Sequence, residues 1–305
     1  MDFSGALLNR PWAVMTAELH AILELARTTP AAGASAALTR RSAIAGSNWS
    51  SSSRIAVLPL LGFLSQRIDP LDFGDTSLER FATVFDQVVK DPSIDSIVIE
   101  VDSPGGSIYG TDELAARIFA ARGGKRVVAI ANTLAASAAY WIGSAAAELS
   151  CAPSGEVGSI GIVAIHHDFS RAEDAAGVDV TLISSGMYKT EGNEHEPLGN
   201  TARAALQDRV NAYYGMFLRA VARHRGVSVA DVHDGFGEGR VIGAEDALRM
   251  GMVDRVETID ELLARVAASP APATIPRARA GSDLGMEERR VGRLRLRDAM
   301  RRIGQ

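Results

Sequence analysis

Strand-sized apolar runs alternate with helix-sized amphipathic stretches between residues 54 and 265. The apolar runs predict strands at 55–64, 96–102, 125–131, 159–165, 178–184 and 253–257. The amphipathic stretches predict helices at 77–89, 111–121, 201–224 and 244–250, and one that begins near Ser137. Ser77 is the expected N-cap of the first helix, with Arg80 in its third position. Strands separated by such helices favour βαβ crossovers, which give an α/β fold with a parallel sheet and flanking helices on both faces.

Low-complexity stretches flank this region on both sides. Residues 30–53 are mostly small and polar, so they cannot bury enough apolar surface to offset the entropy of ordering, and they predict a linker. The prolines of 269–276 favour a stiff spacer. The predicted domains are therefore an N-terminal helix around 12–25 with its linker (1–53), a globular domain (54–265), and a spacer with an Arg-rich tail (266–305).

Composition restricts the class of protein further. The chain has 305 residues, 47% of them hydrophobic and 23% charged, which is typical of a globular protein. No apolar run reaches the roughly 18 residues of a spanning helix and no signal peptide is recognisable, so we expect an intracellular protein without a membrane anchor. Cys151 is the single cysteine, which excludes an intrachain disulfide and favours a buried structural thiol.

Charge and motifs argue against several partners. Residues 277–305 carry nine Arg against four acidic residues, a net +5, so the total of −5 leaves −10 on residues 1–276. The body therefore has no basic surface for nucleic acid. The chain also has no phosphate-binding glycine loop and no zinc-spaced His/Cys cluster. We expect no cofactor, no metal and no required nucleic acid.

The strand ends are the places to search for chemistry, because ligands of parallel α/β sheets bind beyond the carboxyl ends of the strands. The strand at 96–102 is followed by DSPGGS, in which Gly105 and Gly106 permit positive φ and let backbone N–H groups face a ligand. These N–H groups could form half of an oxyanion hole. The simpler interpretation is a tight strand-to-helix turn.

Ser137 follows the strand at 125–131 and begins an alanine-rich segment. It could be only a small capping residue. As a nucleophile it would combine exposure at a strand end with a helix terminus, and the Ala138 N–H would complete the oxyanion hole.

A serine nucleophile needs a base, and the candidates are His166, His167, His195 and Lys189. A lysine serves only where burial lowers its pKa by about three units, which is roughly 4 kcal/mol. Within the segment from Ile183, Met187 and Tyr188 precede Lys189 and the first acidic residue is Glu191, which partly meets this need. The Ser159 hydroxyl could orient the amine.

Taken in order, DSPGG, AASAAYWI, GSIGI and a lysine 52 residues after Ser137 resemble the signal peptide peptidase A (protease IV) family of serine peptidases. The segment GRVIGAEDALRMGMVD at 239–254 is similar to that family's closing signature. The resemblance covers about residues 54–265. It implies a ClpP/crotonase-like fold and a Ser-Lys dyad, with Ser137 as nucleophile, Lys189 as general base and Ser159 assisting the lysine. It places the oxyanion hole at backbone N–H groups of Gly105, Gly106 and Ala138.

The layout around this unit resembles the head-maturation proteases of tailed phages, the lambda-type capsid protein C branch. That resemblance implies an endopeptidase that processes scaffold or minor capsid proteins in the bacterial cytoplasm, in association with a procapsid. It also implies a homo-oligomer. The alanine-crowded site favours small apolar residues before the scissile bond, and the Arg-rich tail is expected to dock on an acidic capsid or scaffold partner.

Three other interpretations stay open. A ClpP-like Ser-His-Asp peptidase could use His166 or His167 with Asp168. A crotonase-type acyl-CoA enzyme would share the sheet and the glycine-built hole, but it would use carboxylates. A non-catalytic capsid or scaffold component could retain the fold without the chemistry.

Overall fold

The computed structural model describes residues 12–15, 54–67 and 76–269. Its strands are β1 (Trp12–Val14), β2 (Ile55–Ser65), β3 (Thr76–Ser77), β4 (Ser96–Ser107), β5 (Arg126–Ala136), β6 (Glu148–Cys151), β7 (Glu156–Gly158), β8 (Val241–Gly243) and β9 (Arg255–Val256). Its helices are α4 (Leu78–Lys90), α5 (Thr111–Ala121), α6 (Ala138–Ser144), α7 (Ser170–Ala176), α8 (Asn200–Arg225), α9 (Val229–Gly235), α10 (Ala244–Arg249) and α11 (Ile259–Ala268).

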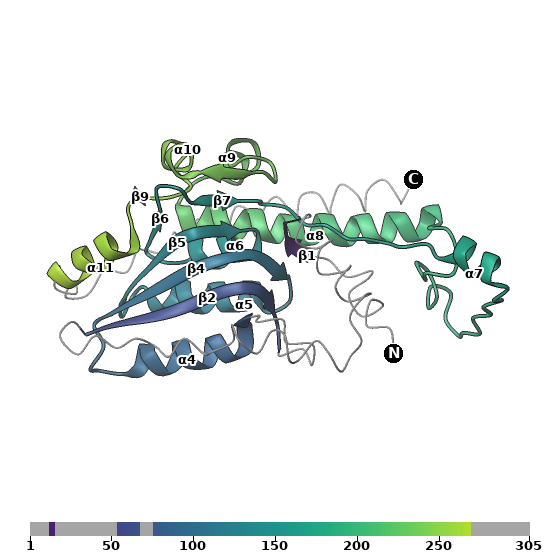
Figure 1. The fold of residues 1–305 in the computed structure, drawn as a ribbon, viewed down its shortest axis with the longest axis horizontal. Coiled ribbons are helices and arrows are strands. Elements are labelled where there is room, and N and C mark those ends of the chain that lie inside the picture. The colour runs from purple at the N-terminus through teal and green to yellow at the C-terminus, as the bar shows by residue number, and fades with distance from the viewer. Residues whose placement is uncertain (1–11, 16–53, 68–75, 270–305) are drawn as a thin grey trace, which may run out of the picture. The chain divides into compact units, whose positions relative to one another are not determined.

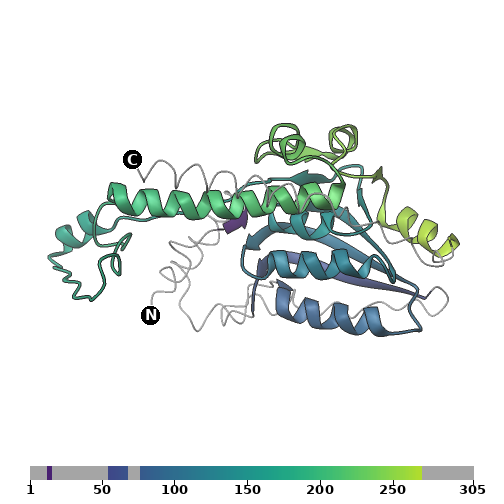
Figure 2. The same cartoon turned by 180° about the vertical axis from the view of Figure 1, so that it is seen from behind.

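The strands form one mostly parallel sheet in the order β3-β2-β4-β5-β6-β9. All neighbours along this path pair in parallel, as does β5 with β7, whereas β1 with β4 and β7 with β8 are antiparallel. Figure 1 shows β2, β4 and β5 side by side with α4, α5, α6 and α8 on one face, and Figure 2 shows these helices from the other side. The parallel α/β sheet expected from the sequence is confirmed.

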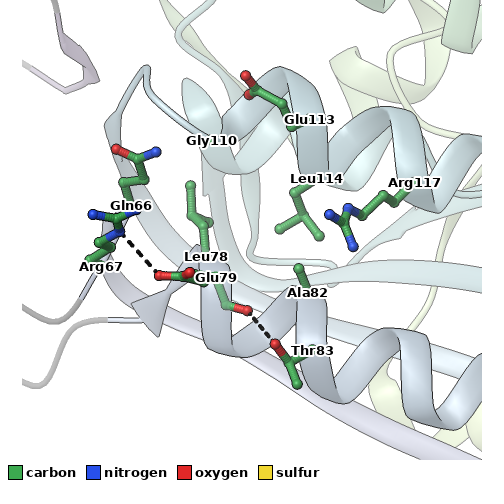
Figure 3. A pocket seen from close by; sticks show the side chains of 10 residues that line it. All are labelled: Gln66, Arg67, Leu78, Glu79, Ala82, Thr83, Gly110, Glu113, Leu114 and Arg117. Carbon is green, nitrogen blue, oxygen red and sulfur yellow. Dashed lines mark hydrogen bonds and ion pairs between the residues drawn. The ribbon is translucent and has the colours of Figure 1, made fainter.

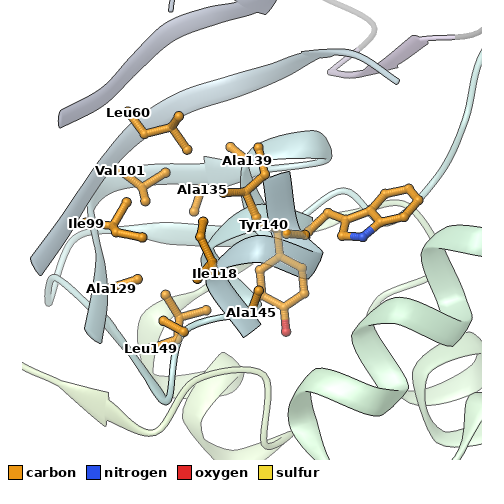
Figure 4. Packing of buried hydrophobic residues seen from close by; sticks show 14 of the residues in the cluster. Leu60, Ile99, Val101, Ile118, Ala129, Ala135, Ala139, Tyr140, Ala145 and Leu149 are labelled. Atoms are coloured by element: carbon orange, nitrogen blue, oxygen red, sulfur yellow. The ribbon is translucent and has the colours of Figure 1, made fainter. Parts of the chain in front are cut away.

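The core lies mainly between the sheet and these four helices. Alternate residues of β4 and β5 point into it, and the buried aromatic rings of α6 and α8 close it, as Figure 4 shows for Ile99, Val101, Ala135 and Tyr140. On the other face, Leu262 and Val266 of α11 pack against the strands. Cys151 lies buried in the main core, and burial raises the pKa of its thiol to about 11, so the expected structural thiol is confirmed.

Most predicted helices occur where the pattern placed them. Ser77 caps α4 and its hydroxyl accepts a hydrogen bond from the Arg80 N–H. Helix α8 ends at Arg225, and the following C-cap residue, Gly226, has a positive φ of 69°. The strand predictions at 159–165 and 178–184 were wrong, because 159–165 contributes only an isolated bridge at Val163 and 178–184 has no partner strand.

Two further expectations fail. The helix expected from residue 12 does not begin there, since Trp12–Val14 is a strand, and residues 16–25 lie outside the described residues. The DSPGGS segment is not a turn into a helix, because β4 continues through Ser107. The division at residues 53 and 265 stays a prediction, and the linker 30–53, residues 270–276 of the spacer and the tail 277–305 lie outside the described residues.

A buried histidine joins α6 to α8. The Ser144 hydroxyl donates to the Trp141 carbonyl, and its oxygen lies 3.0 Å from His224 Nδ1. The His224 ring stacks on Phe119. Beside it, Trp141 stacks on Phe217 with ring centroids 4.5 Å apart. These contacts fix the helix that begins after Ser137.

His224 should make the protein sensitive to acid. Burial, aided by neighbouring arginines, lowers the pKa of His224 to about 3. The unfolded chain binds a proton at this position below about pH 6.5 while the folded chain does not, so stability is lost as the pH falls from 6.5 towards 3. Between pH 6.5 and 4.5, wild type should lose about 2 kcal/mol more unfolding free energy than His224→Gln. Urea unfolding at both pH values measures this difference, and equal losses would contradict the assignment.

Candidate active site

Ser137 occupies a strained turn between strand and helix. It follows β5 directly and is the N-cap of α6, with φ 54° and ψ −119°. A positive φ is uncommon for residues other than glycine and is concentrated at functional sites. The surrounding backbone holds it on both sides, since its N–H donates to the Gly158 carbonyl at 2.7 Å and its carbonyl accepts from the Trp141 N–H at 3.0 Å.

The Ser137 side chain is fully buried, and its Oγ has no hydrogen-bond partner among the described residues. Leaving a buried hydroxyl unpaired costs about 1–3 kcal/mol. Its side chain also makes no capping bond to α6. The capping interpretation therefore loses support, and a hydroxyl kept at a strained turn without a structural bond is what a nucleophile requires.

Gly105 lies against Ser137. Its φ is +100°, and a Cβ added there would stand 3.0 Å from both the Ala136 carbonyl oxygen and the Ser137 Cβ. A Cβ at Gly106 would meet the Leu64 carbonyl oxygen at 2.0 Å, so neither position accepts a side chain. The positive φ expected from the glycine pair is thus present at Gly105.

The N–H groups proposed for the oxyanion hole differ in their surroundings. The Gly105 N–H donates to Ser103 Oγ at 3.1 Å, and that hydroxyl donates to the Gly62 carbonyl at 2.6 Å. Ala138 is the first residue of α6, directly after Ser137. An oxyanion at Gly105 would therefore have to replace the hydroxyl of Ser103, a buried residue that the sequence pattern marks only as part of the DSPGGS segment.

Ser159 follows β7 at a second strained position, with φ 52°. Its N–H donates to the Arg240 carbonyl at 2.7 Å, and the residue before it accepts the N–H of Ser137. Both candidate serines thus have positive φ and lie at neighbouring points of the β5–β7 pair. Strain at both positions is a structural signal that the sequence pattern did not contain.

The structure does not bring Lys189 to Ser137. Lys189 is exposed and lies in the arm, by which we mean residues 166–199 between Val163 and α8. Figures 1 and 2 show α7 and its flanking loops beside the first turns of α8. Large apolar side chains in the arm are exposed, and the extreme cases are Ile183 at 95% and Met187 at 87%. Four more side chains of the arm are exposed at 41–59%, namely Val178, Val180, Leu182 and Tyr188.

The histidines of the arm do not form a triad with Asp168. The Asp168 carboxylate accepts hydrogen bonds from the N–H and the hydroxyl of Ser170, which lowers the pKa of the carboxyl group. His166 Nε2 lies 2.8 Å from the Asn193 carbonyl oxygen, and His195 pairs with Glu173. None of these contacts joins a histidine to Asp168 or to Ser137, so they do not form a Ser-His-Asp triad.

A cavity of about 340 Å³ lies elsewhere, between α4 and α5 (Figure 3). Its walls carry charges that are already paired in part, including Arg67 with Glu79 at 3.3 Å and Arg117 with Asp86 at 2.6 Å. It includes neither candidate serine nor Lys189. We therefore do not place the chemistry in it.

Comparison with known proteins finds a family match for the part of the chain that contains these residues. The family model for peptidase family S49 matches residues 120–271, which include Ser137, Ser159 and Lys189. The capsid assembly protease C of Escherichia phage lambda is 34% identical over 204 residues, covering 66% of this chain and 46% of that protein. The head-tail preconnector protein GP5 of Enterobacteria phage P21 is 31% identical over 243 residues, covering 78% and 48%. The chain thus spans about half the length of these relatives.

Among solved structures, a mutant of the 1510-N membrane-bound stomatin-specific protease, in complex with a substrate peptide, is similar with a TM-score of 0.43 and 18% identity. It covers 70% of this chain and 80% of that chain. The sheet order and the family match bear out the predicted ClpP/crotonase-like α/β class and the predicted resemblance. The chain carries a peptidase family S49 domain and belongs to that family.

Proposed function

We propose that the chain is a serine endopeptidase with Ser137 as its nucleophile. The observation that carries this proposal is the buried, unpartnered Ser137 hydroxyl at a strained strand-to-helix turn, beside Gly105 and within the family S49 match. Ser137 Oγ would attack the substrate carbonyl carbon, and N–H groups of Gly105, Gly106 and Ala138 would stabilise the resulting oxyanion.

The base in this proposal is Lys189, assisted by Ser159. It would take the Ser137 proton during attack and return it to the leaving amine. A lysine acts in this way only when it is removed from water, because desolvation favours its neutral form. In the single chain Lys189 is exposed, so the dyad requires a partner surface that buries it.

A second copy of the chain is the partner that this proposal requires. Burying an exposed Ile or Met side chain stabilises an interface by about 1.5–3 kcal/mol. Ile183 and Met187 are on the same arm as Lys189, so the arm offers that gain close to the base. We therefore propose a homo-oligomer in which the arm of one copy carries Lys189 to the Ser137 of another.

The names of two relatives, capsid assembly protease C and head-tail preconnector protein GP5, support a proposal for the biological setting. We propose that this chain processes scaffold or minor capsid proteins of a phage or prophage, in the bacterial cytoplasm and at a procapsid. We propose no cofactor and no nucleic-acid requirement. Among the described residues, no helix combines the length and apolar character needed to cross a membrane.

Hydrolysis of an unfolded, fluorescently labelled protein near pH 8 tests this function. We expect wild type and the double variant His166→Ala/His167→Ala to cleave at similar rates, because those rings contact the arm and not Ser137. Cleavage should occur mainly after small apolar residues. Sensitivity of the double variant would favour a Ser-His-Asp triad, and an inert wild-type oligomer would favour a non-catalytic capsid component.

A further inference from the structure

A short segment from the N-terminal part of the chain, β1, lies between the end of β4 and Val163. Strand β1 pairs antiparallel with the end of β4, with Trp12 opposite Ser107, Ala13 opposite Gly106 and Val14 opposite Gly105. The Met15 N–H donates to the Pro104 carbonyl at 3.1 Å. On the opposite edge, Trp12 exchanges two hydrogen bonds with Val163, at 2.8 and 3.0 Å. The segment is therefore bonded on both sides, as an added peptide strand would be.

This segment crosses the candidate nucleophile. A Cβ at Gly105 would stand 2.3 Å from the Ala13 carbonyl oxygen and 3.0 Å from the Ser137 Cβ. The distance from that carbonyl oxygen to the Ser137 Cβ therefore cannot exceed the sum of these two values. Ala13 and Ser137 are both fully buried. The backbone of β1 thus covers Ser137 next to the glycines of the proposed oxyanion hole.

The side chains of β1 alternate between two surroundings. Trp12 and Val14 form a small cluster with Phe63, Val163, Ile165 and Phe169, and the rings of Trp12 and Phe63 are 5.5 Å apart. Ala13, between them, belongs to the main core, together with Ala135 and Ala138, which flank Ser137 in the chain. The groove therefore accepts a small residue facing the nucleophile and larger apolar residues on either side of it.

We propose that Trp12–Met15 occupies the peptide-binding groove of this enzyme as a built-in substrate mimic. Protein substrates would bind there as an extended strand, with a small apolar residue at the position of Ala13 and apolar residues beside it. The segment would have to leave before such a substrate binds. This inference rests on the proposed function for the identity of Ser137 as the nucleophile.

Two observations are consistent with a segment that can leave the groove and that is not cleaved while it is bound there. Strand β1 is only three residues long and stands off the main path of the sheet, so few hydrogen bonds hold it. The Ala13 carbonyl would escape attack because no base contacts the Ser137 hydroxyl, which has no hydrogen-bond partner among the described residues. A segment tethered to its own groove has an effective concentration on the order of millimolar, so substrates at about 10 μM would compete poorly.

Binding of a peptide to the full-length chain tests this proposal. The probe is a fluorescent peptide of residues 9–17, measured by anisotropy on Ser137→Ala protein so that no cleavage interferes. Adding Ala13→Glu places a charge in the buried groove and should release the segment. We expect at least about tenfold tighter peptide binding to the variant with Ala13→Glu than to Ser137→Ala alone. A peptide carrying Ala13→Phe should not bind either protein.

The control is Val84→Glu, which adds the same charge at an exposed position of α4 and should leave peptide binding unchanged. If Ala13→Glu unfolds the protein, Trp12→Ser/Val14→Ser offers a milder release, with circular dichroism reporting the fold. The inference would be overturned if Ser137→Ala protein bound the peptide equally well with and without the substitution that releases the segment.

Hydrolysis separates this inference from the proposed function. If the Ser137→Ala/Ala13→Glu variant binds the peptide while neither wild type nor Ala13→Glu cleaves unfolded protein, the groove assignment stands and the peptidase proposal fails. If wild type and Ala13→Glu cleave unfolded protein at equal rates, the peptidase proposal stands and the built-in mimic is wrong.

Discussion

Replacing Ser137 by Ala should abolish hydrolysis of unfolded protein, with a loss of at least about 10³-fold, while the folded protein becomes no less stable. The activity is lost because no other described hydroxyl combines a strand-to-helix turn with the neighbouring N–H groups of Gly105 and Ala138. Stability is kept because Ser137 Oγ has no hydrogen-bond partner among the described residues. Removing an unpaired buried hydroxyl should be neutral or stabilising by about 1–2 kcal/mol.

Ser144→Ala provides the matched control, since it removes another buried hydroxyl, at the last residue of the helix α6 that follows Ser137. Ser144 Oγ donates to the Trp141 carbonyl and contacts His224 Nδ1, so its loss should cost about 1–3 kcal/mol with activity retained at temperatures where the protein stays folded. Unfolding curves and hydrolysis rates of both variants are the measurements. Retained activity in Ser137→Ala, or destabilisation equal to that of Ser144→Ala, would assign Ser137 a structural role instead.

The parts of the fold that could be predicted are those determined locally. The cap of α4 at Ser77, the stop of α8 at Gly226 and helix α5 follow from residues within a turn of each boundary. The buried strands β2 and β4 were recognisable because continuous apolar runs are typical of a parallel sheet covered on both faces. For the same reason the position of Ser137 after β5 was predictable, because β5 is a buried strand followed by an alanine-rich helix.

The failures share a dependence on partners distant in the sequence. Residues 178–184 alternate like a strand, but β structure needs a neighbouring strand and the chain supplies none there. The local periodicity around Trp12–Val14 predicts a helix. The segment is instead a strand because it pairs with Gly105–Ser107 and with Val163. The positive φ values of Ser137 and Ser159 are likewise set by the surrounding sheet and not by their neighbours in sequence.

The exposed arm offers one explanation for both the missing strand at 178–184 and the separation of Lys189 from Ser137. Its alternating apolar residues predicted burial, and the single chain leaves them in water together with Lys189. Both the misplaced strand and the separated dyad would be resolved by one contact with a second copy. In that case the sequence pattern of the arm describes the oligomer and not the monomer.

Mixing two inactive variants should therefore restore activity. Ser137→Ala keeps Lys189, and Lys189→Ala keeps Ser137, so each can supply the group that the other lacks if the dyad forms between copies. With random assortment of co-expressed chains, a site has an intact serine and an intact lysine in about one quarter of cases, so about one quarter of wild-type activity is expected. Each variant alone should be inactive.

The arm itself provides the control for this experiment. Adding Ile183→Glu and Met187→Glu to the Ser137→Ala chain places charges in the proposed interface while Lys189 stays intact, and the mixture should then remain inactive. Sedimentation of the same samples reports whether the oligomer is lost. A mixture without activity, from chains that co-assemble and a wild type that cleaves, would instead require the arm to fold back onto its own Ser137. The exposed apolar side chains around Lys189 would then be buried within one chain, and the proposed contact between copies would be wrong.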